Sequence, residues 1–253
     1  MTTFASTARL SPSFHLKRAG FTAGALFFCA GCVLYFLAKA ALAVTAPEPV
    51  DGPLTFEGLA RVIDGDTLEI AGQRVRLEGI DAPESAQSCA KADGAAWPCG
   101  HVAASALHAL VAGKTVVCDR TGRDKYGRTL GLCFAEGDDI NGALVRAGYA
   151  WAFVKFSQAY VAVEAQARAA KAGVWQGAAQ APWDFRHNEW QTAEVAAPQG
   201  CAIKGNISNK GHIYHVPWSP WYERVTISQA RGERWFCSEA EAMAAGWRAA
   251  LPN

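Results

Sequence analysis

The sequence carries almost no net charge. Its 24 Lys and Arg are balanced by 23 Asp and Glu, which gives a formal net charge of +1 at pH 7 over 253 residues. Proteins that bind nucleic acid without sequence preference usually draw their affinity from many phosphate contacts and are strongly basic. The charge balance therefore disfavours a purely binding role, whereas it is compatible with a catalytic cleft, which needs only a few well-placed cations.

Acidic residues are missing from the beginning of the chain, where no Asp or Glu precedes Glu48. Arg9, Lys17 and Arg18 come before an apolar run over residues 21–38. Basic residues followed by such a run are typical of export segments, in which the positive charges stay inside. We therefore predict a cytoplasmic stub and a transmembrane or signal segment over residues 1–45. The rest of the chain would then lie outside the cytoplasmic membrane, facing the periplasm or the exterior.

Two fates of this segment remain open. The length of the apolar run favours a retained membrane anchor through residues 21–38, because cleaved signals usually have a shorter apolar core. Ala41-Leu42-Ala43 nevertheless offers a cleavage site, and cleavage there would make the protein secreted. Both fates place the remaining chain in an oxidising compartment.

Cys-x-x-Cys pairs are absent outside the apolar run and the histidines are scattered, which argues against a zinc site. The six cysteines that follow the run are an even number, which indicates disulfides in an exported protein. We predict pairing between nearest neighbours because each pair brackets one local unit, although spacing alone does not fix the connectivity. The predicted pairs are Cys89–Cys99, Cys118–Cys133 and Cys201–Cys237.

Strand and helix patterns alternate after a spacer at residues 46–53. Residues 59–70 read as two β-rich arms around an Asp-Gly turn, and residues 73–80 alternate so that Val75 and Leu77 share one face. This order is that of an α+β fold and fits a small five-stranded β-barrel with packed helices. The further predicted elements are a helix over 101–113, strands over 115–120 and 129–134, a short helix over 140–148 and a longer helix over 157–172.

The chain beyond the export segment divides into three parts. The barrel domain is predicted over residues 54–186. Residues 187–199 lose periodicity and are predicted to be a linker. Residues 200–253 are predicted to form a small β-rich module that ends in a helix, at whose start Ser238 and Glu241 have the spacing of a capping box.

Four short motifs carry residue types suited to chemistry. Each motif alone has an ordinary structural explanation, such as a turn, a helix start or a charged hairpin. Their meaning therefore depends on their combination. The motifs are Ile63–Thr67 (IDGDT), Arg76–Glu84 (RLEGIDAPE), Asp124–Gly131 (DKYGRTLG) and Asn141–Gly148 (NGALVRAG).

Together the motifs supply the parts that phosphodiester hydrolysis needs. Asp66 and Asp81 offer hard oxygen ligands of the kind that calcium takes. Glu84 is suited to hold the attacking water, while Arg76 and Arg128 stay charged and can fork onto phosphate oxygens. The reaction requires a cation that polarises the phosphoryl oxygen, a base or water holder, and donors for the developing charge.

In this order and spacing the motifs resemble those of the staphylococcal-nuclease (thermonuclease) family, over about residues 54–175. The resemblance implies an OB-type five-stranded barrel and a calcium-dependent hydrolase that cuts the 5′ P–O bond of DNA and RNA and leaves 3′-phosphate ends. It leaves open whether Glu84 acts as the general base or orients the water. The implied catalytic residues are Arg76, Glu84 and Arg128. The implied calcium site consists of Asp66, Asp81 and the backbone carbonyl of Ala82, with Asp64 nearby but outside the ligand set.

The resemblance also bears on substrate binding. Lys125 and Tyr126 match positions near the terminal phosphate of a bound nucleotide. Val154 and Phe156 stand where staphylococcal nuclease has tyrosines, and Phe156 keeps a ring that can stack on a base. Staphylococcal nuclease also lacks the loop over residues 85–100, which contains two of the cysteines.

The C-terminal module faintly resembles a small SH3-like module appended to secreted bacterial proteins. The motif Lys204-Gly205-Asn206-Ile207 is part of this likeness. Trp218, Trp221 and Trp235 would either form a docking surface or supply the core of the module, and the core is favoured because so short a unit has little else to bury.

The sequence thus predicts an exported calcium-dependent nuclease with nucleic acid as substrate, the membrane as a contact through residues 21–38, and no obligate protein partner. One alternative is a non-catalytic protein that binds nucleic acid or the envelope on the same scaffold. Another is a phosphodiesterase that uses a transition metal.

Overall fold

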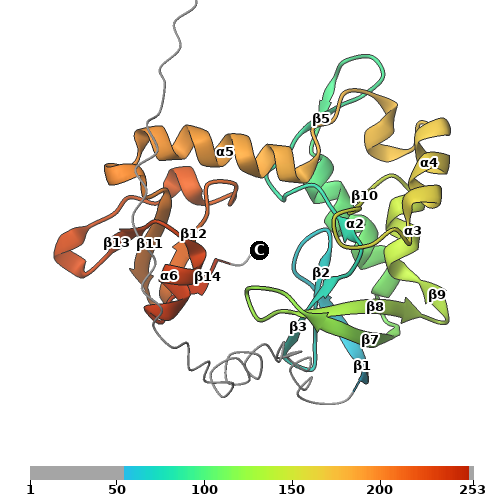
Figure 1. Ribbon diagram of the computed structural model, residues 1–253, viewed down its shortest axis with the longest axis horizontal. Coiled ribbons are helices and arrows are strands. Elements are labelled where there is room, and N and C mark those ends of the chain that lie inside the picture. Colours follow the sequence, from blue (N-terminus) through green and yellow to red (C-terminus); the bar gives the residue numbers. More distant parts are fainter. Residues whose placement is uncertain (1–53, 251–253) are drawn as a thin grey trace, which may run out of the picture. The chain divides into compact units, whose positions relative to one another are not determined.

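The computed structural model describes residues 54–250 (Figure 1). The predicted export segment and the spacer lie outside the described residues. Within residues 54–250, no helix is long and apolar enough to cross a membrane. The described residues all belong to one compact unit.

A closed barrel of five strands forms the first part of this unit (Figure 1). Neighbours in the order β3-β2-β1-β7-β8 pair antiparallel, and a parallel pairing of β3 with β8 closes the barrel. Val75 and Leu77 are both 0% exposed, as the alternation of their strand predicts. The predicted α+β fold with a five-stranded barrel is therefore confirmed. The strands are β1 (Thr55–Val62), β2 (Thr67–Ile70), β3 (Gln73–Leu77), β7 (Thr115–Arg123) and β8 (Thr129–Ala135).

Helices and short strands complete the barrel domain. Helix α2 packs against β1 through Ala103, Leu107 and Val111, which recur every fourth residue and so lie on one face. The helix predicted over 157–172 is shorter than expected. The helices are α2 (Cys99–Val111), α3 (Ile140–Arg146) and α4 (Val161–Ala169). The short strands are β4 (Ile80–Asp81), which pairs with β10 (Trp151–Ala152), β5 (Cys89–Ala90), which pairs with β6 (Ala96–Trp97), and β9 (Asp138–Asp139).

Helix α5 (Pro182–Ala196) runs through most of the segment predicted to be an aperiodic linker, and this expectation is corrected. Proline in its first turn and an acid near its N-terminus favour helix formation there. Its buried and half-buried positions recur at helical spacing on one face, but that face includes the charged Arg186 and Glu189, which explains the missing apolar periodicity. Trp183 stacks on Phe153 of the barrel domain, with ring centroids 5.6 Å apart, while Trp190 and Ala193 pack against the C-terminal module.

The C-terminal module is a four-stranded sheet covered by one short helix. The helix, α6 (Glu239–Ala244), begins at Ser238, whose Oγ accepts a hydrogen bond from the Glu241 N–H at 3.1 Å, as the capping spacing predicts. The helix ends at Ala244, because Gly246 has a positive φ of 82° and the chain continues into a strand. The strand order is β13 (Arg234–Phe236), β11 (Ile203–Ser208), β12 (Gly211–His215) and β14 (Arg248–Ala249).

The aromatic core of the module differs from the predicted one. Phe236 is 0% exposed and Trp247 is 7% exposed, and both belong to the buried core. The three tryptophans predicted for this core, Trp218, Trp221 and Trp235, are only half-buried. All three predicted disulfides are present: Cys89–Cys99, Cys118–Cys133 and Cys201–Cys237.

Asn141, from the fourth motif, holds the barrel together from the inside. It is 0% exposed, and its Nδ2 donates to the carbonyls of Glu78 at 2.9 Å and Gly131 at 3.1 Å. We expect Asn141→Ala to lower the free energy of unfolding by about 2 kcal/mol, because buried polar groups then lose their partner. Urea denaturation measures this loss. The exposed Asn188→Ala is the control and should change stability by less than about 0.5 kcal/mol; an equal effect of both changes would contradict the assignment.

Candidate active site

The chemically suited residues of the first two motifs meet at one end of the barrel. Asp64 and Asp66 lie on the turn between β1 and β2, and Arg76 lies on β3. Asp81 is on β4, and Glu84 follows shortly after it. Since β2 pairs directly with β3, with Thr67 opposite Arg76, the turn and the arginine are adjacent.

Two glycines allow the close packing of this region. A Cβ on Gly65 would lie 2.8 Å from the Cβ of Ala82, so only glycine lets the turn approach this closely. The approach lets Asp66 Oδ2 accept a hydrogen bond from the Ala82 N–H at 2.9 Å. At Gly100, the second residue of α2, a Cβ would lie 1.8 Å from the Glu84 carbonyl oxygen.

Carboxylates and guanidiniums alternate across the site. Arg76 donates through Nη1 to Asp66 Oδ1 and through Nη2 to Asp81 Oδ1, the latter at 2.7 Å. Arg186, from α5, donates through Nη2 to Asp81 Oδ2 at 2.8 Å and through Nη1 to Glu84 Oε1 at 2.7 Å. These residues are called the carboxylate–guanidinium row below: Asp66, Arg76, Asp81, Arg186 and Glu84.

The pKa values of Asp66 and Glu84 in the row, and of Asp64 beside it, are shifted from their ordinary values. Burial raises the pKa of Asp64 to about 7, and the charge of Asp66 adds to the effect. It also raises the pKa of Glu84 to about 7, against the opposing influence of Arg186. Burial acts on Asp66 in the same direction, but the charge of Arg76 and the N–H of Ala82 outweigh it and its pKa is lowered. Near neutral pH, Asp64 and Glu84 are therefore close to the point at which the carboxyl group gains a proton, whereas Asp66 stays ionised.

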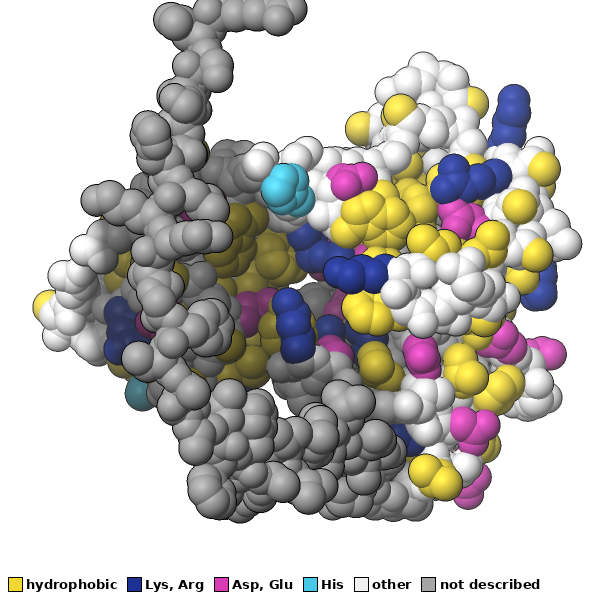
Figure 2. Space-filling view, in the orientation of Figure 1, with side chains coloured by type: hydrophobic (Ala, Val, Ile, Leu, Met, Phe, Trp, Pro, Cys, Tyr) yellow, Lys and Arg dark blue, Asp and Glu magenta, His cyan; other side chains and the backbone are white. Residues whose placement is uncertain are grey.

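The residue types at the site are of the kind that bind divalent cations. Asp64 and the three carboxylates of the row make four acids, against two guanidiniums in direct contact with them. Such an excess of hard oxygen donors suits calcium. Within residues 54–250, no three His, Cys, Asp or Glu side chains converge as a ready-made metal site, and Arg76 and Arg186 stand between the carboxylates of the row. Figure 2 shows basic and acidic side chains close together around the hollow in the middle of the face it presents.

The loop between β7 and β8 carries three more predicted residues. Asp124 Oδ2 accepts from Arg128 Nε at 2.6 Å, and its Oδ1 accepts from the backbone N–H of Tyr126 and of Arg128. Lys125 Nζ lies 4.7 Å from the centre of the Tyr126 ring. Arg128 is paired with Asp124 and not with an acid of the row. Its charge nevertheless lowers the pKa of Asp66, with a smaller effect than burial or the charge of Arg76. The structure thus brings Lys125, Tyr126 and Arg128 together on one loop; the charge of Arg128 reaches Asp66, whereas Lys125 and Tyr126 lie beside Glu239 of the C-terminal module.

An exposed aromatic surface follows β10. Phe156 is 66% exposed and meets Phe153 edge to face, with ring centroids 5.0 Å apart. Trp183 covers the Phe153 ring in a stacked arrangement and is itself 36% exposed. The predicted stacking residue Phe156 is therefore accessible, and α5 adds Trp183 beside it.

Two residues of the site were missed by the sequence analysis. Arg186 fell in the segment next to the predicted linker, and the helix-start signal of Pro182 and Asp184 was the clue to its position. Gln87 lies in the loop that staphylococcal nuclease lacks. Its Oε1 accepts from the Glu84 N–H at 3.2 Å and its Nε2 donates to the Gln180 carbonyl at 2.6 Å, so it links Glu84 to the segment leading into α5.

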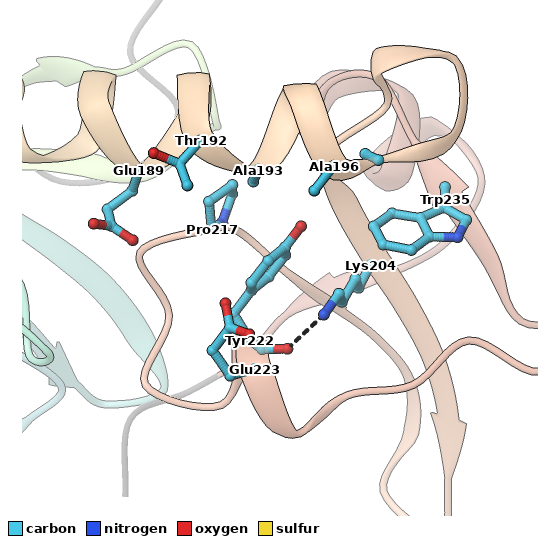
Figure 3. Close-up of a pocket in the computed structure, with 10 residues that line it drawn as sticks. Glu189, Thr192, Ala193, Ala196, Lys204, Pro217, Tyr222, Glu223 and Trp235 are labelled. Atoms are coloured by element: carbon cyan, nitrogen blue, oxygen red, sulfur yellow. Dashed lines mark hydrogen bonds between the residues drawn. The ribbon is translucent and has the colours of Figure 1, made fainter.

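A separate cavity of about 280 Å³ lies between α5 and the C-terminal module (Figure 3). Lys204 points into it, donates to the Tyr222 carbonyl at 2.9 Å and lies over the Tyr222 ring. None of the predicted site residues lines this cavity.

The closed barrel, with paired carboxylates and arginines at one end, defines an OB-type barrel protein whose site suits phosphate-ester chemistry. Residues 74–177 match the family model described as Staphylococcal nuclease homologue. The chain belongs to this family. Residues 190–249 match a second family model, described as ArfC.

Several relatives align with the same region. The chain is 42% identical over 134 residues to a succinoglycan biosynthesis protein, ExoI, of Rhizobium meliloti (strain 1021), covering 52% of this chain and 67% of the relative. It is 37% identical to an uncharacterized endonuclease of Escherichia coli O157:H7, covering 52% of this chain and 84% of the relative. It is 32% identical to a micrococcal nuclease of Shigella flexneri, covering 59% and 88%.

Proposed function

We propose that this protein is a calcium-dependent nuclease that hydrolyses phosphodiester bonds of DNA and RNA. The carboxylate–guanidinium row is the observation that carries the proposal, because it joins a surplus of carboxylates to arginines at the end of a barrel of this family. Relatives named as an endonuclease and as a micrococcal nuclease support it.

Each residue of the site has a role in this proposal. Asp66, Asp81 and the carbonyl of Ala82 would hold the calcium, which when bound would polarise a phosphoryl oxygen. Glu84 accepts a hydrogen bond from the attacking water and orients it. Arg76 and Arg128 donate to the phosphate oxygens on which negative charge develops in the transition state. Asp64 would remain close to the ion without ligating it.

The rest of the nucleotide meets the surfaces beside the row. Lys125 and Tyr126 would contact a terminal phosphate, and the exposed ring of Phe156 would stack on a base. Because an accessible ring favours unpaired bases, single-stranded or frayed nucleic acid is the expected substrate. Cleavage at the 5′ P–O bond leaves 3′-phosphate ends.

The chemistry of the products tests this function. The fragment over residues 46–253, with its disulfides formed, should cut single-stranded DNA in calcium and leave ends that 3′-exonucleases accept only after phosphatase treatment. Cutting in manganese or zinc but never in calcium would point to a transition-metal phosphodiesterase. Binding of DNA that is insensitive to chelators and leads to no cleavage would instead support the scaffold alternative.

The location outside the cytoplasmic membrane, with residues 21–38 as an anchor, is part of the same proposal. It rests on the basic residues and the apolar run near the N-terminus. Protease added to intact cells or spheroplasts should remove the nuclease domain, and membrane fractions should contain the full chain. An SH3-like role for the C-terminal module also stays a prediction, with binding to isolated envelope as its test.

A further inference from the structure

Arg186 reaches the active site from outside the segment that matches the nuclease family. The match ends at residue 177, and Arg186 lies on α5, which begins at Pro182. Its guanidinium nevertheless contacts two acids of the row, Asp81 and Glu84. Arg186 therefore contacts carboxylate oxygens that the proposed function assigns to calcium binding, on Asp81, and to the attacking water, on Glu84.

The contacts of Arg186 conflict with a cation on Asp81. The carboxylate of Asp81 is 0% exposed, and Arg186 donates to both of its oxygens, at 3.2 Å to Oδ1 and 2.8 Å to Oδ2. Arg76 donates to Oδ1 as well. These three donors leave about one of the four lone-pair sites of the carboxylate free, and a divalent cation bound there would be repelled by a guanidinium at this distance. Withdrawal of one arginine would relieve this repulsion when a cation binds.

Arg186 is the arginine more free to leave. Its side chain is 24% exposed against 16% for Arg76. Its second partner is Glu84, which is not a proposed calcium ligand, whereas the second partner of Arg76 is Asp66, which is one. The helix itself is held in place, because Trp183 stacks on Phe153 and the Gln180 carbonyl accepts from Gln87. The movement is therefore one of the side chain and not of α5.

We propose that Arg186 is a positioning residue that serves as an internal cation. Without calcium its guanidinium occupies the oxygens of Asp81, and calcium binding displaces it from Asp81 while it remains beside Glu84. This inference rests on the proposed calcium site. It predicts that the carboxylates of the row are held in place before calcium binds. It also predicts that competition with Arg186 sets part of the calcium affinity.

Calorimetric calcium titration of the protein over residues 46–253 tests the competition. Arg186→Gln should bind calcium about tenfold more tightly than the wild type, because a competing charge is gone. Arg186→Lys keeps the charge but not the two-pronged contact, and it should fall between the two. Arg61→Gln, which removes an exposed arginine paired with Glu69, is the matched control and should leave the affinity unchanged.

The outcomes separate this inference from the proposed function. Calcium binding that is equal or weaker in Arg186→Gln, with circular dichroism like that of the wild type, overturns the competition and leaves the calcium site standing. If Arg186→Lys binds calcium with the same affinity as the wild type, only the charge of Arg186 matters and not its two-pronged contact with Asp81. That result also overturns the inference. Absence of calcium binding in the wild type and in every variant overturns both the competition and the proposed calcium site. Calcium binding that is lost in Asp81→Asn shows that the ion binds at Asp81.

Discussion

Replacing Arg128 with alanine should lower the turnover of nucleic-acid cleavage by about a thousandfold while the protein stays folded. The side chain of Arg128 is 30% exposed and is held by Asp124 on the surface of the β7–β8 loop, so its truncation leaves no cavity in the core. What is lost is a donor to the phosphate oxygens in the transition state. Single-turnover cleavage at saturating calcium measures the effect.

Arg76→Ala should reduce turnover by a similar factor, for a related reason. Its guanidinium bridges Asp66 and Asp81, so the change removes a phosphate donor and also leaves two buried carboxylates without their shared partner. Arg61→Ala, on the exposed side of β1, is the control for the loss of one positive charge and should cut at the wild-type rate. Near-wild-type turnover of Arg76→Ala or Arg128→Ala would contradict the assignment of the site.

The disulfide inside the barrel is expected to have a large effect on stability. Cys118 and Cys133 face each other across β7 and β8, are both 0% exposed, and close a loop with a sequence separation of 15. A crosslink of that length stabilises the folded chain by about 3 kcal/mol in the chain-entropy model. The double variant Cys118→Ala, Cys133→Ala should lose about this free energy of unfolding in urea denaturation. A loss below about 1 kcal/mol would show that strand pairing alone holds this part of the barrel.

Local patterns were enough to predict the barrel. The alternation that buries Val75 and Leu77 and the Asp-Gly turn between β1 and β2 depend on neighbouring residues, and the structure contains both. The disulfides are present as predicted. They could be predicted because each joins two cysteines that are nearest neighbours along the chain. Helix α5 escaped this kind of reasoning. Its inward face carries Arg186 and Glu189 among the apolar residues, so no continuous apolar stripe marks it in the sequence.

The site was predictable in its residue types but not in its contacts. The motifs place Asp66, Asp81 and Glu84 within a short stretch of sequence and also contain the arginines Arg76 and Arg128. The sequence does not say that Arg76 bridges two aspartates, because that contact depends on the pairing of β2 with β3. Arg186 lies 105 residues from Asp81, and only the docking of α5 brings the two together.

Cleavage of single-stranded DNA by residues 46–253, first with calcium and then with excess chelator, tests the central claim most directly. The account predicts cutting in calcium, none in chelator, and loss of cutting in Glu84→Gln, which keeps the shape of the side chain but not its charge. Absence of cutting under both conditions by a folded, oxidised wild-type protein would contradict the account and favour a binding role for the barrel. Unchanged cutting by Glu84→Gln would contradict the role of the row.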